Sequence, residues 1–194
     1  MNSEPNTLLL HGWYGDGQEN WFPWLKDQLE ANGHTVFAPY LPDPIHPTPK
    51  AWQGVLDEFK EDMTDGIVIW HSLGVPTAIR FITHNHLSIS HLVFVAPTFP
   101  EQRHIIDLSQ YEWLIETEER FYADSEDLEK VSHLCEKIDL FLSKDDPYIP
   151  YDHALMYYSQ IDGIKLHSFE NKGHFNQAAW VTEFPELLET LESA

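Results

Sequence analysis

The feature that most constrains the fold of this chain is a regular alternation of short apolar runs with longer segments of helical periodicity. The apolar runs predict strands at residues 7–10, 35–38, 67–70, 91–96, 137–142 and 165–169. The other segments predict helices at residues 21–32, 51–59, 73–85, 152–161 and 176–191. Strands that alternate with helices form a mostly parallel sheet, because each helix returns the chain for the next parallel strand. The sequence therefore predicts an α/β fold in three layers, with helices on both faces of one sheet.

One segment interrupts this alternation. Residues 97–133 are acidic and include aromatic residues, among them Tyr111, Trp113, Phe121 and Tyr122. The segment is too long for a simple connection, and long segments over a sheet are often lids or binding loops. The chain otherwise shows no repeat, no low-complexity tract and no linker, and its 194 residues suit one core. We therefore expect a single domain, 1–194.

The chain carries no recognisable signal for export or for membrane insertion. No apolar run approaches the roughly 20 residues that a transmembrane helix needs. The N-terminus has no basic region and too short an apolar stretch for a signal peptide. Cys135 is the single cysteine, so no disulfide can form within the chain. These features predict a cytoplasmic location, where thiols stay reduced.

The charge of the chain narrows its possible partners. Its 11 Lys and Arg against 32 Asp and Glu give a formal net charge of −21. Such a surface repels phosphate backbones and anionic lipids, so neither nucleic acids nor membranes are expected as partners. The acidity is explained by solubility, by a salty habitat, or by a preference for neutral or cationic substrates. Composition does not separate these explanations, and it does not predict the oligomeric state.

The carboxyl ends of the predicted strands identify candidate functional residues, because ligands of such sheets bind beyond these ends. Ser72 stands between a predicted strand at 67–70 and a predicted helix at 73–85. A serine on such a tight turn projects its hydroxyl away from the backbone, next to the positive end of the helix. A hydroxyl is a weak nucleophile, so it needs a base and a group that orients the base.

Asp146 and His174 are candidates for these two roles. Each follows a predicted strand, and the chain order Ser72, Asp146, His174 is the order that this architecture imposes on nucleophile, acid and base. A serine before a helix is by itself a weak signal, because serine is a common helix cap. Three such residues at three strand ends predict a catalytic triad. In it His174 takes the Ser72 proton, and Asp146 holds the imidazole in the right tautomer.

Several short motifs, spread over nearly the whole chain, form one recognisable set. They include Leu9-Leu10-His11-Gly12, His71-Ser72-Leu73-Gly74, Ser143-Lys144-Asp145-Asp146-Pro147 and Gly173-His174-Phe175. They resemble the α/β hydrolase superfamily, and within it the small serine hydrolases of the retinoblastoma-binding-protein or YdeN-like type. The resemblance implies a core of about six strands that lacks the superfamily's first two, with no large cap domain. It also implies a serine hydrolase that cleaves an ester-like or amide-like bond of a small molecule through an acyl-enzyme, without a cofactor.

The resemblance also implies an oxyanion hole, which stabilises the negative charge that develops on a substrate carbonyl oxygen. Two backbone N–H groups are expected to stabilise it, that of Leu73 directly after the nucleophile and that of Trp13 by the family pattern. Gly12 permits close approach of the backbone, although an ordinary glycine turn is the alternative interpretation. Gly12 and Tyr14 are candidate substrate-binding residues. Trp13, Tyr14 and aromatic residues of 97–122 are candidates for an apolar substrate pocket.

One position departs from the family pattern. The elbow of the superfamily is usually Gly-x-Ser-x-Gly; Gly74 fits this pattern, but Trp70 replaces the first glycine. We expect Trp70 to be buried and to point away from the helix that begins near Leu73. In that orientation the indole leaves the turn intact. If the indole instead distorts the turn, the alternative is a catalytically weak or inactive hydrolase-fold protein that binds a partner.

The remaining candidates are weaker. Asp145 competes with Asp146 for the acid role, but the family pattern places the acid directly before Pro147. Cys135 precedes a strand, so it is not expected to be a nucleophile. The histidines share no metal-ligand spacing, and one cysteine supports no zinc motif, so no metal is expected. His71 neighbours the nucleophile but is expected to point elsewhere.

Overall fold

The computed structural model of the chain describes residues 4–100, 121 and 125–193. Its centre is one sheet with the strand order β2-β1-β3-β4-β5-β6, in which every neighbouring pair is parallel. The strands are β1 (Thr7–Leu10), β2 (Val36–Phe37), β3 (Gly66–His71), β4 (Ile89–Val95), β5 (Cys135–Ser143) and β6 (Lys165–Phe169). The predicted parallel sheet is confirmed, and each predicted strand is present.

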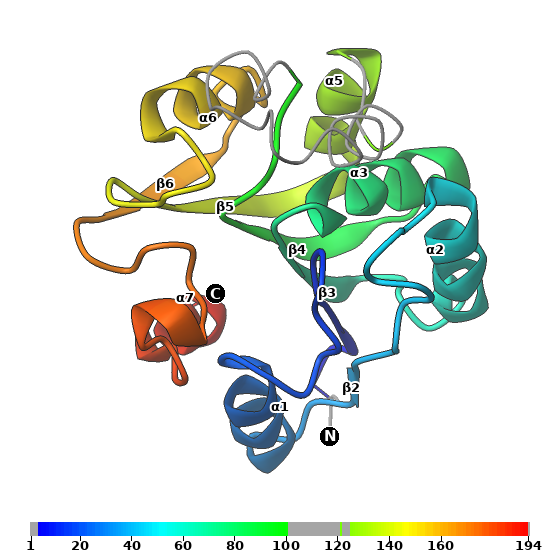
Figure 1. Cartoon of the computed structure of the whole chain (residues 1–194). Coiled ribbons are helices and arrows are strands. Elements are labelled where there is room, and N and C mark those ends of the chain that lie inside the picture. The colour runs from blue at the N-terminus through cyan, green and yellow to red at the C-terminus, as the bar shows by residue number, and fades with distance from the viewer. Residues whose placement is uncertain (1–3, 101–120, 122–124, 194) are drawn as a thin grey trace.

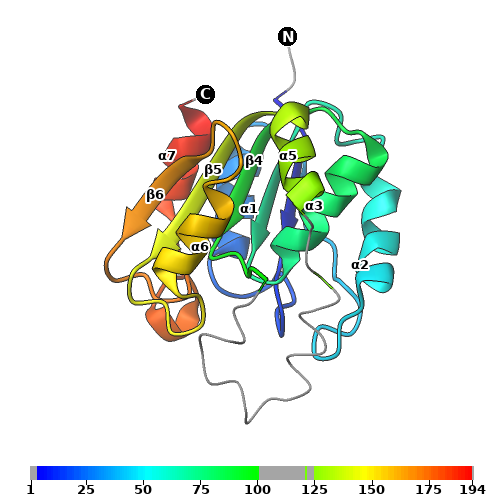
Figure 2. The same ribbon diagram turned by 90° about the horizontal axis from the view of Figure 1, so that it is seen from above.

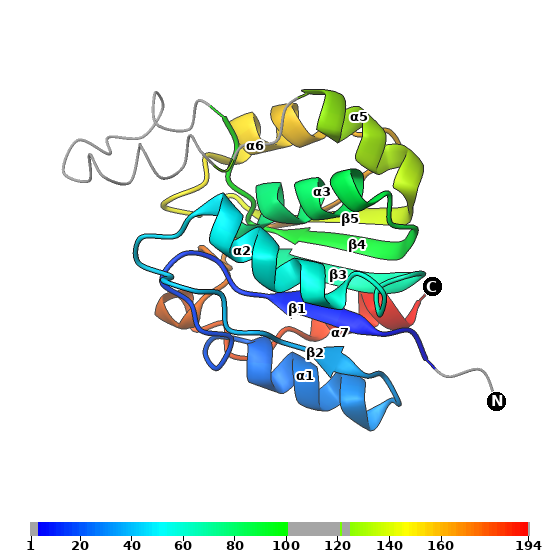
Figure 3. The ribbon, with the colours of Figure 1, turned by 90° about the vertical axis from the view of Figure 1, so that its right-hand side faces the viewer.

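Helices cover both faces of the sheet, as Figures 1 and 3 show. One face carries α1 (Phe22–Ala31) and α7 (Pro185–Glu192). The opposite face carries α2 (Pro49–Leu56), α3 (Gly74–Asn85), α5 (Ser125–Leu134) and α6 (Tyr151–Tyr158). A short 3-10 helix at Asp57–Phe59 follows α2, and another at Gln177–Ala179 precedes α7. Figure 2 shows the same three layers from above, with α3, α5 and α6 in front of the strands and α1 and α7 behind them.

The central strands are apolar because both of their faces are covered. Every residue of β3 is buried, which agrees with the uninterrupted apolar run that it contains. The edge strand β6 is largely exposed by comparison. Three tryptophans fill the layers next to the sheet and are fully buried: Trp21 before α1, Trp52 in α2 and Trp70 in β3. The core therefore lies on both sides of β1, β3 and β4.

The strand order reverses its direction at β1. The chain passes from β1 through α1 to β2 on one side, and later through α2 to β3 on the other side of β1. In open α/β sheets this reversal leaves a crevice at the carboxyl ends of the two diverging strands, and ligands bind there. The topology therefore places the site at the ends of β1 and β3.

The helix predicted at residues 176–191 is wrong in its first half. The chain instead forms the 3-10 helix Gln177–Ala179, and Trp180 follows it with a left-handed φ of 61°. A left-handed residue ends a helix. A proline also disfavours a helical conformation in the residue before it, so α7 begins at Pro185.

The acidic segment 97–133 ends in a helix. Its last part forms α5, which packs against α3, so the expectation of one long loop is wrong there. Tyr111, Trp113 and Tyr122 lie outside the described residues, and their proposed part in a pocket stays a prediction. Among the helices that the structure describes, none is long and apolar enough to cross a membrane.

Candidate active site

Ser72 stands on a sharp turn between β3 and α3. Its φ of 56° lies in the left-handed region, which is uncommon for residues other than glycine. The Ser72 N–H donates to the Val95 carbonyl oxygen at 2.9 Å, and the Ser72 carbonyl oxygen accepts the Val75 N–H at 3.2 Å. These bonds hold a strained backbone that displays the hydroxyl at the end of the strand.

The turn after β1 lies directly against this elbow. A Cβ atom at Gly12 would stand 2.8 Å from the Ser72 Cβ and 2.8 Å from the His71 carbonyl oxygen. No side chain fits there unless one of the two turns moves, so the contact requires glycine. Gly12 thereby brings the Gly12–Trp13 peptide beside the Ser72 side chain.

The structure brings Ser72, Asp146 and His174 together from the ends of β3, β5 and β6. The His174 Nε2 lies 3.0 Å from the Ser72 Oγ, and its Nδ1 lies 2.9 Å from the Asp146 Oδ2. Because Nδ1 faces a carboxylate, it carries the proton, and Nε2 accepts the hydrogen of the Ser72 hydroxyl. The side chains of His174 and Asp146 are 11% and 2% exposed. This arrangement can move a proton from a hydroxyl to an imidazole.

Asp146, and not Asp145, contacts the imidazole of His174. The other oxygen of Asp146, Oδ1, accepts the backbone N–H groups of Tyr148 and Ile149 at 2.8 and 3.0 Å. Charge-assisted bonds of this kind are stronger than bonds between neutral groups. They hold the carboxylate in one orientation, with Oδ2 towards His174.

Asp145 instead anchors the loop that carries the imidazole. Its Oδ1 accepts the Ser143 hydroxyl at 2.5 Å and the Gly173 N–H at 2.9 Å. The bond from Ser143 is the main reason why the pKa of this exposed carboxyl is lowered, and the bond from Gly173 acts in the same direction. Since Gly173 directly precedes His174, Asp145 acts on the position of the loop and not on the ring.

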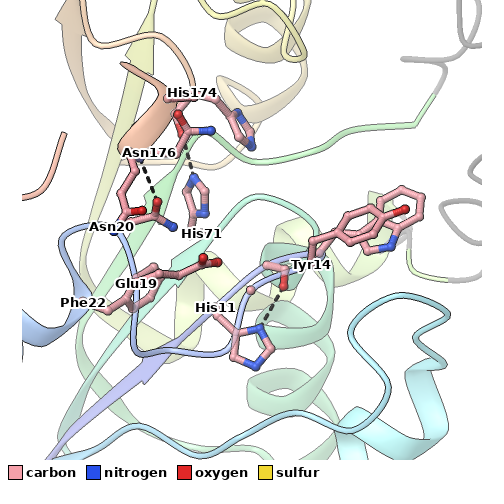
Figure 4. A pocket seen from close by; sticks show the side chains of 13 residues that line it. His11, Tyr14, Glu19, Asn20, Phe22, His71, His174 and Asn176 are labelled. Carbon is pink, nitrogen blue, oxygen red and sulfur yellow. Dashed lines mark hydrogen bonds between the residues drawn. The ribbon is translucent and has the colours of Figure 1, made fainter. Parts of the chain in front are cut away.

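His71 also holds this loop, which the sequence does not reveal. The sequence predicts that His71 points elsewhere, but its Nε2–H donates to the His174 carbonyl oxygen at 2.9 Å, as Figure 4 shows. Burial, and then the nearby His174, lower the pKa of His71 to about 3, so its ring stays neutral. The Trp21 indole adds a second bond to the loop, to the Phe175 carbonyl oxygen at 2.9 Å. No motif signals these bonds, because they depend on how β3 and α1 pack beneath the loop.

Trp70 is fully buried, as predicted, but the prediction that it points away from α3 is wrong. The indole lies directly over the start of that helix, because a Cβ atom at Gly74 would stand 1.3 Å from the Trp70 Nε1. Gly74 has no side chain, so the space above it accommodates the ring. Ser72 keeps its left-handed φ beside the indole, and the elbow is therefore not relaxed.

The candidate oxyanion donors lie on two sides of Ser72. Leu73 follows it and caps α3, whose first N–H groups have no partners within the helix. Trp13 follows Gly12, and its indole N–H donates to the Ile45 carbonyl oxygen at 2.9 Å. Tyr14 stacks on the Trp13 ring, with the ring centroids 5.8 Å apart, and is 55% exposed. The turn after β1 therefore presents an aromatic surface next to Ser72.

A cavity of about 270 Å³ opens beside His174, between the turn after β1, the start of α1 and the loop after β6 (Figure 4). The sequence predicts an apolar pocket with aromatic walls. Trp13, Tyr14 and Phe22 line the cavity, but so do the polar side chains of Glu19 and Asn20. Burial, and then the charge of Asp16, raise the pKa of Glu19. The described part of the pocket is therefore mixed in polarity, with an acidic group in its wall.

Other groups in the described residues do not form a second reactive centre. No three His, Cys, Asp or Glu side chains of this part of the chain are placed so that they could hold a metal ion. Cys135 is buried, and burial raises the pKa of its thiol to about 12. A thiol must ionise to attack, so Cys135 is a poor nucleophile.

Known proteins share both the sequence and the fold of this chain. The family described as serine hydrolase matches residues 7–193. The Bacillus subtilis hydrolase YdeN is 25% identical over 193 residues, which cover 96% of this chain and 94% of that protein. The serine hydrolase RBBP9 of Rattus norvegicus is 28% identical over 188 residues, which cover 96% of this chain and 88% of that protein. The crystal structure of the ydeN gene product has a TM-score of 0.84 at 26% identity, and 97% of each chain is covered. The resemblance inferred from the motifs is confirmed, and this chain belongs to the serine hydrolase family.

Proposed function

We propose that this hydrolase cleaves ester-like bonds of small substrates, with Ser72 as nucleophile, His174 as base and Asp146 as the orienting acid. The observation that carries the proposal is the placement of one imidazole, 3.0 Å from the Ser72 Oγ and 2.9 Å from the Asp146 carboxylate. The strained φ of Ser72 supports it, because strain at a nucleophile persists only where the surroundings impose it.

In the proposed reaction, His174 Nε2 takes the Ser72 proton while Oγ bonds to the substrate carbonyl carbon. The carbonyl oxygen becomes an oxyanion, which the N–H groups of Leu73 and Trp13 stabilise. One such donor contributes about 3–4 kcal/mol in well-studied enzymes. The imidazolium then protonates the leaving alcohol as the ester C–O bond breaks, and Ser72 is left acylated. Water then gives a proton to His174 as its oxygen bonds to the acyl carbon. The bond between this carbon and the Ser72 Oγ breaks, His174 returns the proton to Oγ, and the carboxylic acid leaves.

Charge and cavity size support small substrates that are neutral or cationic. The cavity of about 270 Å³ has Glu19 in its wall, and the chain carries a net charge of −21. An anionic substrate would approach such a site against a repulsive field. The proposed chemistry uses groups of the chain and water only, so it requires no cofactor. A cytoplasmic location stays a prediction from the single cysteine.

The first test is hydrolysis of p-nitrophenyl esters of increasing acyl length by wild-type protein and by Ser72→Ala. We expect Ser72→Ala to lower kcat by about 10⁴-fold or more, as for triad serines in general. A fluorophosphonate probe should label the wild type and not Ser72→Ala, because only an activated serine reacts. Equal rates for the two proteins would show that the activity belongs to another site.

The same experiment separates two alternatives. A p-nitroanilide of the best acyl group, run beside the ester, tests whether an amide bond is also cleaved. Wild-type protein that is folded, unlabelled by the probe and inactive on all esters would support a binding protein of hydrolase fold instead of an enzyme.

A further inference from the structure

The Trp70 indole connects the elbow of the nucleophile to the neighbouring strand. Trp70 pairs with Leu10 in the ladder between β3 and β1, and β1 ends at Leu10. One residue further on, the His11 carbonyl oxygen accepts the Trp70 Nε1–H at 3.1 Å, in a fully buried environment. A buried carbonyl beyond the end of a ladder needs such a donor, because an unpaired buried polar group is unfavourable.

The His11 side chain fixes the next peptide unit. Its Nδ1–H donates to the Gly12 carbonyl oxygen at 2.8 Å, and its Nε2 accepts the Leu41 N–H at 3.0 Å. These two bonds require a neutral imidazole, with one protonated and one bare nitrogen. Burial lowers the pKa of His11, although the bond to Gly12 opposes the shift, so the neutral form prevails.

Together these bonds determine where the Trp13 N–H points. In a planar trans peptide the C=O and N–H bonds point in opposite directions, so the Gly12 carbonyl sets the direction of the Trp13 N–H. Trp70 orients the His11–Gly12 peptide, and His11 orients the Gly12–Trp13 peptide together with the Gly15 N–H, which donates to the same Gly12 carbonyl oxygen at 3.3 Å. We propose that Trp70 is a positioning residue, whose indole N–H pre-organises the turn that presents the Trp13 N–H to the oxyanion. This inference rests on the proposed function, since the turn matters to the reaction only if Ser72 attacks a carbonyl.

A glycine, the usual residue of the elbow at position 70, has no side chain with which to make this bond. The tryptophan is accommodated because Gly74 leaves room for the ring, and Gly12 lets the oriented turn touch the elbow. The side chain that departs from the family pattern therefore supports the site without occupying it. An oxyanion donor is effective only when it is oriented before the reaction begins.

The test compares two variants of Trp70 that separate the ring from the donor. Trp70→Phe keeps an aromatic ring and removes the N–H. Trp70→Gln keeps an N–H at the same number of bonds from Cβ and removes the ring. With p-nitrophenyl propionate, we expect Trp70→Phe to lower kcat by about 10- to 100-fold, with KM changed less than about twofold. Trp70→Gln should retain more of the kcat than Trp70→Phe, even if it is the less stable protein.

A second readout reports the oxyanion contact itself. Ethyl trifluoromethyl ketone carries the same acyl chain and forms a tetrahedral adduct with a serine, so its inhibition constant should rise in Trp70→Phe by the factor by which kcat/KM falls. The pH at which activity is half-maximal should not move, because the contacts of His174 with Ser72 and Asp146 are unchanged. A purely structural loss would lower the amount of active protein and leave the inhibition constant unchanged.

Thr83→Val is the matched control. Thr83 lies at the far end of α3, and its hydroxyl donates to the Asp127 carboxylate at 3.1 Å in a buried site. The variant also removes one buried hydrogen bond, but far from the turn after β1, so kcat per folded molecule should stay within about twofold of wild type.

The outcomes separate this inference from the proposed function. If wild type has no Ser72-dependent activity, the proposed function fails. If wild type is active and Trp70→Phe matches Thr83→Val in kcat and in inhibition constant, Trp70 does not position the turn. Should Trp70→Phe not fold, Trp70→Gln against Trp70→Leu makes the same comparison between a side chain with a donor and one without. Equal kcat values in that pair would also overturn the inference.

Discussion

Among the described residues, two assemblies join histidine to a buried aspartate side chain, and they differ in what lies beyond the pair. At the carboxyl edge of the sheet, His174 joins Asp146 at 2.9 Å. On the three strands at the β6 side of the sheet, on the face covered by α7, Asp139 of β5 accepts hydrogen bonds from His91 of β4 at 2.6 Å and from His167 of β6 at 2.5 Å. Both carboxylates are shielded from solvent, at 2% and 0% exposure. The residue types and distances alone therefore do not distinguish a site from a structural cluster.

The difference lies in which imidazole nitrogen faces the carboxylate. His174 presents Nδ1 to Asp146, which leaves Nε2 for the Ser72 hydroxyl. His91 and His167 both present Nε2 to Asp139, and the Nδ1 of His91 is buried with no hydrogen-bond partner among the described residues. The first assembly can pass a proton to and from the Ser72 hydroxyl. The second links three adjacent strands through one carboxylate, and in the described part of the chain no hydrogen bond joins it to a hydroxyl or a thiol.

The largest effect that this comparison predicts is the loss of activity in the Asp146→Asn variant. An amide next to Nδ1 can favour the wrong tautomer, in which Nε2 carries the hydrogen and cannot accept the Ser72 proton. We expect kcat on the best ester to fall by about 10⁴-fold, with little change in the urea midpoint. The measurement is steady-state hydrolysis beside urea unfolding. A loss of less than about tenfold would mean that Asp146 does not hold the tautomer.

Asp139→Asn should show the opposite pattern. The change removes the charge that the two histidines surround, and breaking a buried pair of this kind costs about 3–5 kcal/mol of unfolding free energy. The amide oxygen can still accept one bond, so we expect a loss near the lower end, with kcat per folded molecule within about threefold of wild type. Urea unfolding followed by tryptophan fluorescence measures this. The control is Asp162→Asn, an exposed change before β6. Equal stability of the two variants would contradict a structural role for the cluster.

Acid should weaken the assembly around Asp139. Burial alone would raise the pKa of Asp139, but the hydrogen bonds from His167 and His91 outweigh it and hold the pKa well below its ordinary value of 3.8. The unfolded chain therefore binds a proton at this residue at a higher pH than the folded chain does. The stability that this carboxylate contributes is present above about pH 4 and is lost as the pH falls further. Lys137 of β5 and Glu186 and Glu189 of α7 lie on the same face of the sheet.

The measurement for this prediction is the urea midpoint between pH 3 and pH 7 for wild type and Asp139→Asn. The difference between the two proteins should be constant above about pH 5 and should shrink as the pH approaches 3. A difference that does not change with pH would mean that Asp139 contributes no titrating charge to the stability.

How far the sequence predicts these features depends on whether the signal is local. Ser72, Asp146 and His174 each follow an apolar run, and the fold brings the carboxyl ends of parallel strands to one edge, so their proximity is predictable. The bonds of His71, Trp21 and Trp70 to loop carbonyls are not predictable in this way. They depend on the register between strands and on the space above single glycines, and no residue pattern records either.

The cluster around Asp139 illustrates the same limit. An aspartate inside the otherwise apolar end of β5 is a signal that a partner must exist, because a buried charge is costly without one. The sequence does not say that the partners are His91 and His167, since each lies on a different strand and only the strand order brings them together. The first half of the predicted helix 176–191 fails for another reason, because the left-handed Trp180 overrides a helical pattern.

The smallest effect is expected for Asp145→Asn, which tests whether an anchor of the loop matters as much as a partner of the ring. The amide oxygen can still accept the Ser143 hydroxyl and the Gly173 N–H, although without charge assistance. The group is exposed, so water compensates for much of the weaker bonding. We expect kcat/KM on the best ester to fall by no more than about threefold, against the loss of about 10⁴-fold in Asp146→Asn. If the two variants lose similar activity, the loop position would be as important as the tautomer, and the assignment of the acid to Asp146 alone would be wrong.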